Sequence, residues 1–201
     1  MLTRRVVSLS ALLLVHGGCD DRRTPWPVYE PATSELVRLD VDTRGDGSID
    51  IRTYMRGSHV MRTEIDVDRD GRIDRWEYLT DGNQLAKLGT SSVAGGPEDT
   101  LTFRESGGEV RVDRLQGGTR AVTRHEFYRA GVLTRAEEDT NGDGLMDKWE
   151  AYEGGRLRSM AFDTTQQSGQ PDRRLLYDAG GQYASLEIDA NHDGKFERLN
   201  R

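Results

Sequence analysis

Hydrophobic and polar positions alternate with a period of two over short segments of the chain, and polar turns separate these segments. In Arg75-Trp76-Glu77-Tyr78-Leu79, Trp76 and Tyr78 fall on one face, and the turn signal Asp81-Gly82-Asn83 follows. Alternation over five or six residues is typical of a β-strand, and such a segment is too short for a stable helix. The pattern therefore predicts strands rather than helices.

The strand-and-turn pattern recurs about every 24 residues. Seven units begin near polar loops, at Asp42, Asp66, Thr90, Asp113, Asp139, Asp163 and Asp189. Turns such as Ala130-Gly131 and Gly154-Gly155 divide each unit into two strands. Short alternating segments separated by turns predict an all-β fold, in which neighbouring repeats bury apolar surface against one another. We expect an antiparallel meander of about seven hairpin repeats, forming a curled open sheet or a partly closed barrel. A propeller is less favoured, because its blades need about four strands each.

The first 18 residues have the pattern of an export signal. Arg4 and Arg5 precede an apolar run over residues 6–15, which is too short to remain as a membrane-spanning helix. Cys19 is the only cysteine and follows Gly17-Gly18. This segment resembles the lipobox of bacterial lipoproteins, which implies that Cys19 carries a lipid. The alternatives are an ordinary cleaved signal and a cytoplasmic chain with an apolar first helix.

These features predict three segments: a signal peptide over residues 1–18, a lipid-anchored linker over 19–34, and a β-hairpin repeat domain with calcium-binding loops over 35–201. The mature chain is then exported and anchored to a membrane of the cell envelope, facing the periplasm or the outer surface. With one cysteine it forms no internal disulfide.

Composition indicates a thin interior and a cationic partner. Only 34% of residues are hydrophobic, so the core must be small. The net charge is −7, and loss of Arg4 and Arg5 with the signal makes it −9. Such a surface repels nucleic acid, so no nucleic-acid partner is expected.

The loop that starts at Asp66 carries oxygen donors at the spacing of a calcium-binding loop. Calcium takes about six to eight oxygen ligands, which such a loop supplies from its positions 1, 3, 5, 7, 9 and 12. These positions hold Asp66, Asp68, Asp70, Arg72 (through its backbone carbonyl), Asp74 and Glu77. Gly71 at position 6 permits the tight turn between the ligands.

A second loop repeats the complete pattern, and two further loops keep part of it. The second loop offers Asp139, Asn141, Asp143, the Leu145 carbonyl, Asp147 and Glu150. A third keeps Asp189, Asn191, Asp193, the Lys195 carbonyl and Glu197, and a fourth keeps Asp42, Asp46 and Asp50. In the fourth loop Arg44 occupies position 3, where its own charge can replace that of the ion. The remaining units have lost most ligands and are expected to be structural.

The four loops resemble the EF-hand-like calcium loops of dockerins, thrombospondin type 3 repeats and integrin-type FG-GAP repeats. The resemblance implies Ca²⁺ as the cofactor. Strands flank these loops where EF-hands have helices, which implies a structural ion rather than a calmodulin-like switch. The alternative is that the loops are solvated acidic turns that hold no ion.

Together these patterns favour an exported calcium-binding lipoprotein that is not an enzyme and acts as a structural or adhesive binding module, with a glycan or protein partner at the cell envelope. The alternative is a calcium-dependent glycan or cell-wall binder that uses Trp76, Trp149 and Tyr152 for stacking. A secreted hydrolase is less favoured, because the sequence has no nucleophile elbow and no Gly-rich phosphate loop.

Overall fold

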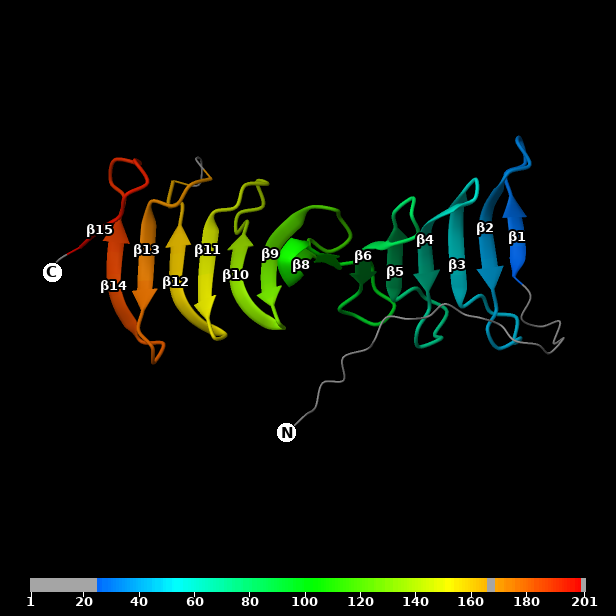
Figure 1. Ribbon diagram of the computed structural model, residues 1–201, viewed down its shortest axis with the longest axis horizontal. Helices are drawn as coiled ribbons and strands as arrows, with labels where there is room; N and C mark the ends of the chain where they lie inside the picture. The colour runs from blue at the N-terminus through cyan, green and yellow to red at the C-terminus, as the bar shows by residue number, and fades with distance from the viewer. Residues whose placement is uncertain (1–24, 166–168, 200–201) are drawn as a thin grey trace.

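The computed structural model describes residues 25–165 and 169–199, which form one antiparallel sheet (Figure 1). Fifteen strands cross it in sequence order. They are β1 (Trp26–Tyr29), β2 (Leu36–Val41), β3 (Ile51–Arg56), β4 (His59–Ile65), β5 (Arg75–Leu79), β6 (Leu85–Thr90), β7 (Thr100–Arg104), β8 (Glu109–Leu115), β9 (Val122–Arg129), β10 (Val132–Glu138), β11 (Lys148–Glu153), β12 (Arg156–Phe162), β13 (Arg173–Tyr177), β14 (Tyr183–Ile188) and β15 (Glu197–Arg198). The predicted all-β meander is confirmed, and the sheet is open.

The two edge strands lie at opposite ends of a long ribbon (Figure 1). β1 contains Pro27, which has no backbone N–H to offer another strand, and β15 is two residues long. Both features limit pairing with a further strand. Among the residues that the structure describes, no helix is long and apolar enough to cross a membrane.

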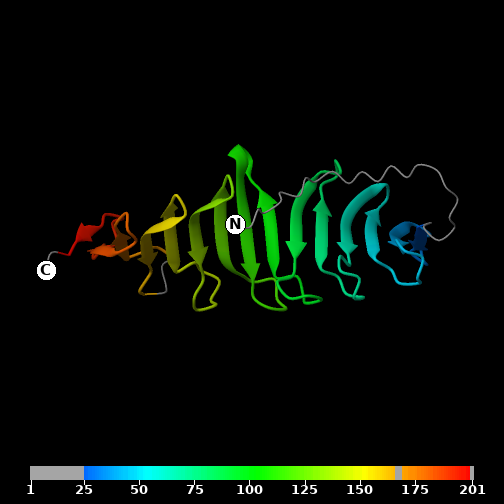
Figure 2. The ribbon, with the colours of Figure 1, turned by 90° about the horizontal axis from the view of Figure 1, so that it is seen from below.

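Long loops and short turns alternate along the chain, so they collect on opposite edges of the sheet. In Figure 1 the long loops lie below β2–β5 and above β10–β15, because the strands rotate progressively along the ribbon. Figure 2 shows the same ribbon from below. The short turns use residues with positive φ, such as Ala130 (49°) and Gly131 (78°), as a two-residue hairpin turn requires.

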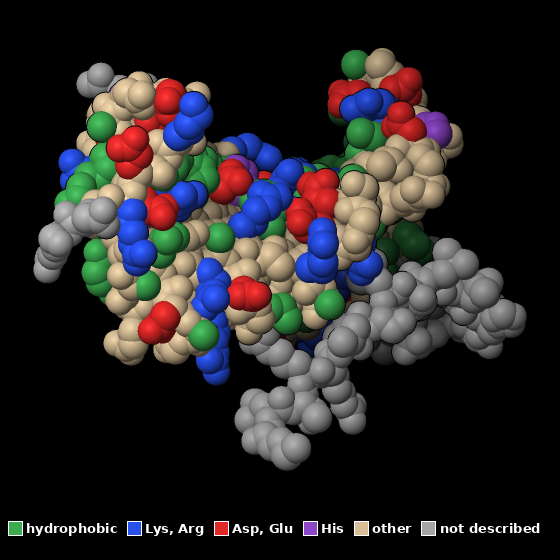
Figure 3. All heavy atoms as spheres, turned by 60° about the vertical axis from the view of Figure 1, so that its left-hand side comes forward, with side chains coloured by type: hydrophobic (Ala, Val, Ile, Leu, Met, Phe, Trp, Pro, Cys, Tyr) green, Lys and Arg blue, Asp and Glu red, His purple; other side chains and the backbone are tan. Residues whose placement is uncertain are grey.

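The hydrophobic interior is as thin as the composition predicts. The buried hydrophobic residues are Leu101, Leu115, Phe127, Ala136 and Ala161. Nine aspartates are buried, so carboxylates outnumber apolar side chains in the interior. Figure 3 shows acidic and basic side chains intermixed on the face that it presents, with hydrophobic side chains scattered between them. Polar contacts therefore supply much of the stabilisation that packing against a second layer supplies in other sheets.

Cations and aromatic rings alternate in one row across nine strands, from β2 to β10. Residues directly opposite one another in antiparallel strands share a face and interact. The strand register places these residues opposite one another in order: Arg38, Tyr54, Arg62, Tyr78, Lys87, Phe103, Arg111, Phe127 and Arg135. We call them the cation–aromatic row.

Each cation of the row from β4 onward stacks on the ring of the strand before it. The charged group of Arg62 lies 4.4 Å from the ring centroid of Tyr54, and that of Lys87 lies 4.2 Å from the centroid of Tyr78. The guanidinium of Arg135 lies 3.2 Å from the Phe127 centroid. Cation–π contacts contribute about 0.5–1 kcal/mol each at exposed sites. The row therefore stabilises the sheet through contacts between neighbouring strands.

An acid two residues further along the strand neutralises each arginine of the row. Arg38 Nε lies 2.7 Å from Asp40 Oδ1, and Arg62 Nη2 lies 2.8 Å from Glu64 Oε1. The pairs Arg111–Asp113 and Arg135–Glu137 follow the same rule, each at 3.1 Å. The row therefore carries little net charge.

On β6 the acid comes from a loop instead of the strand. The position two residues after Lys87 is Gly89, and a Cβ atom there would lie 1.8 Å from Glu98 Oε1. The Glu98 carboxylate thus occupies the space that a side chain at position 89 would fill. Tyr78 Oη donates a hydrogen bond of 2.9 Å to Glu98, just as Tyr54 Oη donates one of 3.0 Å to Glu64. Loop 91–99 therefore completes the pattern on this face.

Because Glu98 of the loop takes the place of an acid at position 89 of the strand, we expect that the acid can be moved from the loop to the strand. Glu98→Ala should lower the free energy of unfolding by about 1–2 kcal/mol, because the partly buried hydroxyl of Tyr78 loses its hydrogen-bond acceptor. Gly89→Glu alone should also destabilise the protein, since both carboxylates then compete for one space. The double variant should recover most of the loss in urea denaturation. Additive losses in the double variant would contradict this account.

Candidate metal centre

The seven long loops share one backbone frame, which is visible in the hydrogen bonds at the loop edge. The residue at position 1 of a loop donates its backbone N–H to the carbonyl of position 9 of the preceding loop, as Asp66 does to Asp50 at 2.9 Å. Position 1 is occupied by Asp42, Asp66, Ser91, Leu115, Asp139, Asp163 and Asp189. Two of the repeat starts therefore differ from the sequence-based alignment: Ser91 replaces Thr90, and Leu115 replaces Asp113, which lies inside β8.

The aspartate at position 1 is buried and organises its own loop. Asp66 is 5% exposed, and its two carboxylate oxygens accept hydrogen bonds from the backbone N–H of Arg69 (2.6 Å) and of Gly71 (2.8 Å). Asp139 accepts equivalent bonds from Gly142 and Gly144. A buried carboxylate is stable only when hydrogen bonds or charges replace its lost hydration, and the loop backbone provides them here.

The pKa of Asp42, at position 1 of the first loop, illustrates the balance between burial and hydrogen bonding. Burial raises the pKa of Asp42, but hydrogen bonds from the backbone N–H groups of Gly47, Arg44 and Gly45 outweigh it and hold the pKa below its ordinary value. The carboxylate is therefore ionised at neutral pH.

The aspartate at position 9 closes the loop from the other side. Asp74 Oδ2 accepts a hydrogen bond of 3.0 Å from the backbone N–H of Val67, and Oδ1 accepts one of 3.2 Å from Gly95 in the next loop. The Gly95 bond is the largest cause of the lowered pKa of Asp74. Gly95 has φ 62° and lies against Arg72, which a Cβ atom would meet at 2.2 Å. Loop 91–99 therefore packs directly on loop 66–74.

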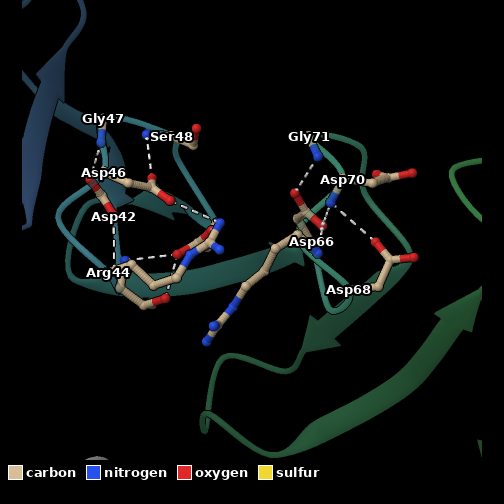
Figure 4. A network of polar contacts seen from close by, with 12 residues as sticks. Asp42, Arg44, Asp46, Gly47, Ser48, Asp66, Asp68, Asp70 and Gly71 are labelled. Atoms are coloured by element: carbon tan, nitrogen blue, oxygen red, sulfur yellow. Dashed lines mark hydrogen bonds and ion pairs between the residues drawn. The ribbon is translucent and has the colours of Figure 1, made fainter.

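Three of the predicted ligands of loop 66–74 converge. One carboxylate oxygen from each of Asp66, Asp68 and Asp74 lies within 4.8 Å of the others. Within the described part of the chain, this is the one group of three or more acidic, histidine or cysteine residues that is so close. The positions are 1, 3 and 9 of the loop, and Figure 4 shows Asp66 and Asp68 beside Asp70 and Gly71. Three carboxylates at this separation repel one another and can hold a hard divalent cation.

The other predicted ligands of this loop lie outside the group of three. Asp70 Oδ1 accepts a hydrogen bond of 2.9 Å from the backbone N–H of Arg72. Glu77 lies in β5, where Arg75 Nη2 is 2.5 Å from its carboxylate. Binding by Glu77 therefore requires this ion pair to open.

In loop 139–147 the acids are held by the protein itself. Asp139 and Asp147 are buried, and the amide of Asn141 donates a hydrogen bond of 3.1 Å to Asp143. Leu145 is exposed at the tip of the loop. These residues keep the predicted order along the loop, and Asn141 offers an amide oxygen at position 3, where loop 66–74 has the carboxylate of Asp68.

Glu150, predicted at position 12 of the same loop, belongs to a charge network on β9–β11. Its carboxylate lies 2.6 Å from Arg124, 2.9 Å from Lys148 and 2.9 Å from the hydroxyl of Tyr152. Burial raises the pKa of Glu150, but these three donors lower it to about 2. The side chain is 7% exposed and already has its cations.

Of the two partial loops, 189–197 is the less enclosed. Asp189 is buried and accepts backbone bonds from Asp193 and Gly194. Asn191 is exposed, Lys195 Nζ lies 3.7 Å from Asp193, and Glu197 begins β15. In loop 42–50, Asp42 and Asp50 are buried and Asp46 is paired with Arg44 (Figure 4).

The residue at position 2 distinguishes loop 66–74 from four other loops, and the sequence analysis did not use it. At this position Thr43, Ser92, Thr140 and Thr164 each donate a hydroxyl hydrogen bond to the aspartate that closes their own loop, which stands at position 9 in the first three loops and at position 10 in the fourth. Loop 66–74 has Val67 there, so Asp74 accepts a hydrogen bond of 3.0 Å from the backbone N–H of Val67 but none from a hydroxyl at this position. The sequence shows this difference as an apolar residue, Val67, at a position where four other loops have Thr or Ser.

The predicted signal peptide 1–18 and the lipidation site Cys19 lie outside the described residues. The sheet itself begins with β1 at Trp26, within the segment 19–34 that the sequence analysis assigned to a linker. A comparison with models of known protein families found no match, and a search of curated proteins found no significant match.

The role of position 2 gives a test of metal affinity. Val67→Thr should weaken calcium binding at loop 66–74 by about fivefold, because an added hydroxyl hydrogen bond of about 1 kcal/mol competes for Asp74. Isothermal titration with calcium measures the change. Val93→Thr, at another exposed loop position, serves as the control and should leave the affinity unaltered. Equal affinities in all three proteins would refute the role of Val67.

The charge network predicts a pH-dependent stability. Because the folded pKa of Glu150 is about 2, against an ordinary value of 4.5, its contribution is present above pH 4.5 and is lost as the pH falls toward 2. Glu150→Gln should cost about 2 kcal/mol at pH 7, since Arg124 and Lys148 lose a partly buried partner. Chemical denaturation should show this difference shrinking between pH 4.5 and 2. Glu153→Gln on the same strand, with a side chain 77% exposed, should have little effect.

Proposed function

We propose that the chain is an exported lipoprotein of the bacterial cell envelope that binds calcium and acts as a structural or adhesive module. The observation that carries the calcium proposal is the convergence of Asp66, Asp68 and Asp74 at the spacing of a calcium loop. Carboxylate oxygens at ligand positions suit a hard cation and offer nothing to soft metals. The export and lipid anchor rest on the sequence of residues 1–19.

Calcium in this place would act on stability. Loop 66–74 joins β4 to β5, and its Asp74 accepts a bond from Gly95 in the loop between β6 and β7. An ion that holds Asp66, Asp68 and Asp74 therefore fixes two neighbouring hairpins. A sheet with few buried apolar side chains gains more from such a clamp than a layered protein does. The complete ligand sequence of loop 139–147 supports a second site there.

The open faces support a binding role more than a catalytic one. One face of the sheet carries the cation–aromatic row, and on the other face Glu150 is paired with Arg124 and Lys148. The acidic net charge disfavours anionic partners such as nucleic acid. We therefore propose a glycan or protein partner at the cell envelope.

A compact stacking platform for sugars receives less support. The register places Trp76 and Trp149 in one row but six strands apart, which is about 29 Å at the usual strand spacing of about 4.8 Å. Tyr152 donates its hydroxyl to Glu150, which lies next to Trp149 in β11 and so points to the other face. These three aromatic residues therefore do not share one short surface.

Thermal unfolding with calcium and with chelator tests the calcium proposal. A ligand at about 100 times its dissociation constant adds about 2.7 kcal/mol, which corresponds to a rise in Tm of about 5–10 °C for a domain of this size. Asp68→Asn removes an exposed carboxylate of the site and should abolish most of this rise. Asp81→Asn, at an exposed turn on the opposite edge, is the matched control and should keep it. Equal melting temperatures of the natural protein in calcium and in chelator would refute calcium binding.

A further inference from the structure

Loop 42–50 has the same frame as loop 66–74, but a side-chain cation lies among its carboxylates. Arg44 stands at position 3, where loop 66–74 has Asp68. Its Nη2 atom lies 3.0 Å from Asp46 Oδ2 and 3.8 Å from Asp50 Oδ1, so it bridges the acids at positions 5 and 9 (Figure 4). In the neighbouring loop, positions 3 and 9 contribute two of the three carboxylates that converge.

Asp50 presents one carboxylate oxygen that no hydrogen bond satisfies. The residue is 3% exposed, and Oδ2 accepts hydrogen bonds from the backbone N–H and the hydroxyl of Thr43. Oδ1 is buried, has no hydrogen-bond donor, and faces the guanidinium of Arg44. A buried carboxylate oxygen without a donor is costly unless a charge compensates it. The positive charge of Arg44 meets that need.

We propose that loop 42–50 is a cation site that is filled by the Arg44 guanidinium of the protein itself, and that loss of this guanidinium converts the loop into a site for a divalent, oxygen-preferring ion such as calcium. The remaining ligands would be Asp42, Asp46, Asp50 and the carbonyl of Ser48, at positions 1, 5, 9 and 7. Arg44 is thus the residue that determines whether this loop is metal-independent.

The guanidinium and a metal ion exclude each other at this loop. A guanidinium and a divalent cation a few ångströms apart repel each other strongly, because little solvent screens them at this partly buried site. The planar guanidinium also has donors for more than one carboxylate, which suits the bridge between Asp46 and Asp50. In the natural protein, loop 42–50 therefore keeps its fold in chelator. The proposal depends on the proposed function only for the choice of calcium as the probe.

Rescue by calcium alone tests the proposal. The variants are Asp68→Asn, which removes the site at loop 66–74, and the double variant Arg44→Asn with Asp68→Asn. In chelator the double variant should melt several degrees below the single variant. In millimolar calcium that gap should close, because the ion replaces the lost guanidinium. Native mass spectrometry should count one more bound calcium on the double variant than on the single variant.

Two further variants make the outcome specific to Arg44. Arg44→Lys, also in the Asp68→Asn background, keeps a cation in the loop and should gain no calcium. Arg56→Asn makes the same change at an exposed position at the opposite edge of the sheet, and it should gain none either. The proposal is overturned if the Arg44→Asn double variant gains no calcium, or if calcium fails to restore its folding. Failure of calcium binding at loop 66–74 has a different signature, because it shows as equal melting of the natural protein and Asp68→Asn in calcium.

Discussion

Within residues 25–165 and 169–199 the sheet has no second layer, and this constraint governs the rest of the structure. In most β proteins one face of a sheet packs on another layer and so removes apolar side chains from water. Here each side chain can be shielded only by its neighbours on the same face or by a loop that folds back. Five buried hydrophobic residues in the described chain are too few to hold fifteen strands. Lateral contacts between strands must therefore supply most of the stability.

The protein meets this constraint differently on its faces and at its loop edge. On one face the cation–aromatic row lets long arginine side chains cover rings while acids two residues away neutralise them. At the loop edge, buried aspartates accept backbone N–H groups and so fix the shape of each loop. The same carboxylates leave negative charge in the loops. The Arg44 guanidinium balances that charge in loop 42–50, and we propose that a divalent ion does so in loop 66–74.

The sequence predicts the parts of this structure that are local. Alternation in Arg75–Leu79 and the glycines after it place a strand and a turn correctly, because both depend on residues next to one another. The repeat period likewise identifies the buried aspartates that begin five of the loops, which are Asp42, Asp66, Asp139, Asp163 and Asp189. The positions of the ligands along the loop 66–74 were also visible in the spacing, and three of them converge.

Features that depend on residues far apart could not be predicted in this way. A glycine inside a strand, such as Gly89, normally lowers the stability of the strand, but here the Glu98 side chain fills the space beside it. The spacing predicts Glu150 as a calcium ligand, but it gives no sign that Arg124 of β9 lies 2.6 Å from the Glu150 carboxylate. Gly95 carries no metal-binding signal of its own, yet it bonds to Asp74 from the next loop. In each case a partner more than eight residues away decides the role.

The sequential order of the strands has a consequence for how the chain can change in length. Each strand pairs only with its neighbours in sequence, and aromatic and cationic strands take turns along the row. Deletion of one strand would set two cations or two rings side by side and would invert the direction of every later strand. Deletion or duplication of a whole hairpin keeps the alternation in phase. Gene duplication or deletion can therefore change the length of the sheet in steps of one hairpin, or about two dozen residues.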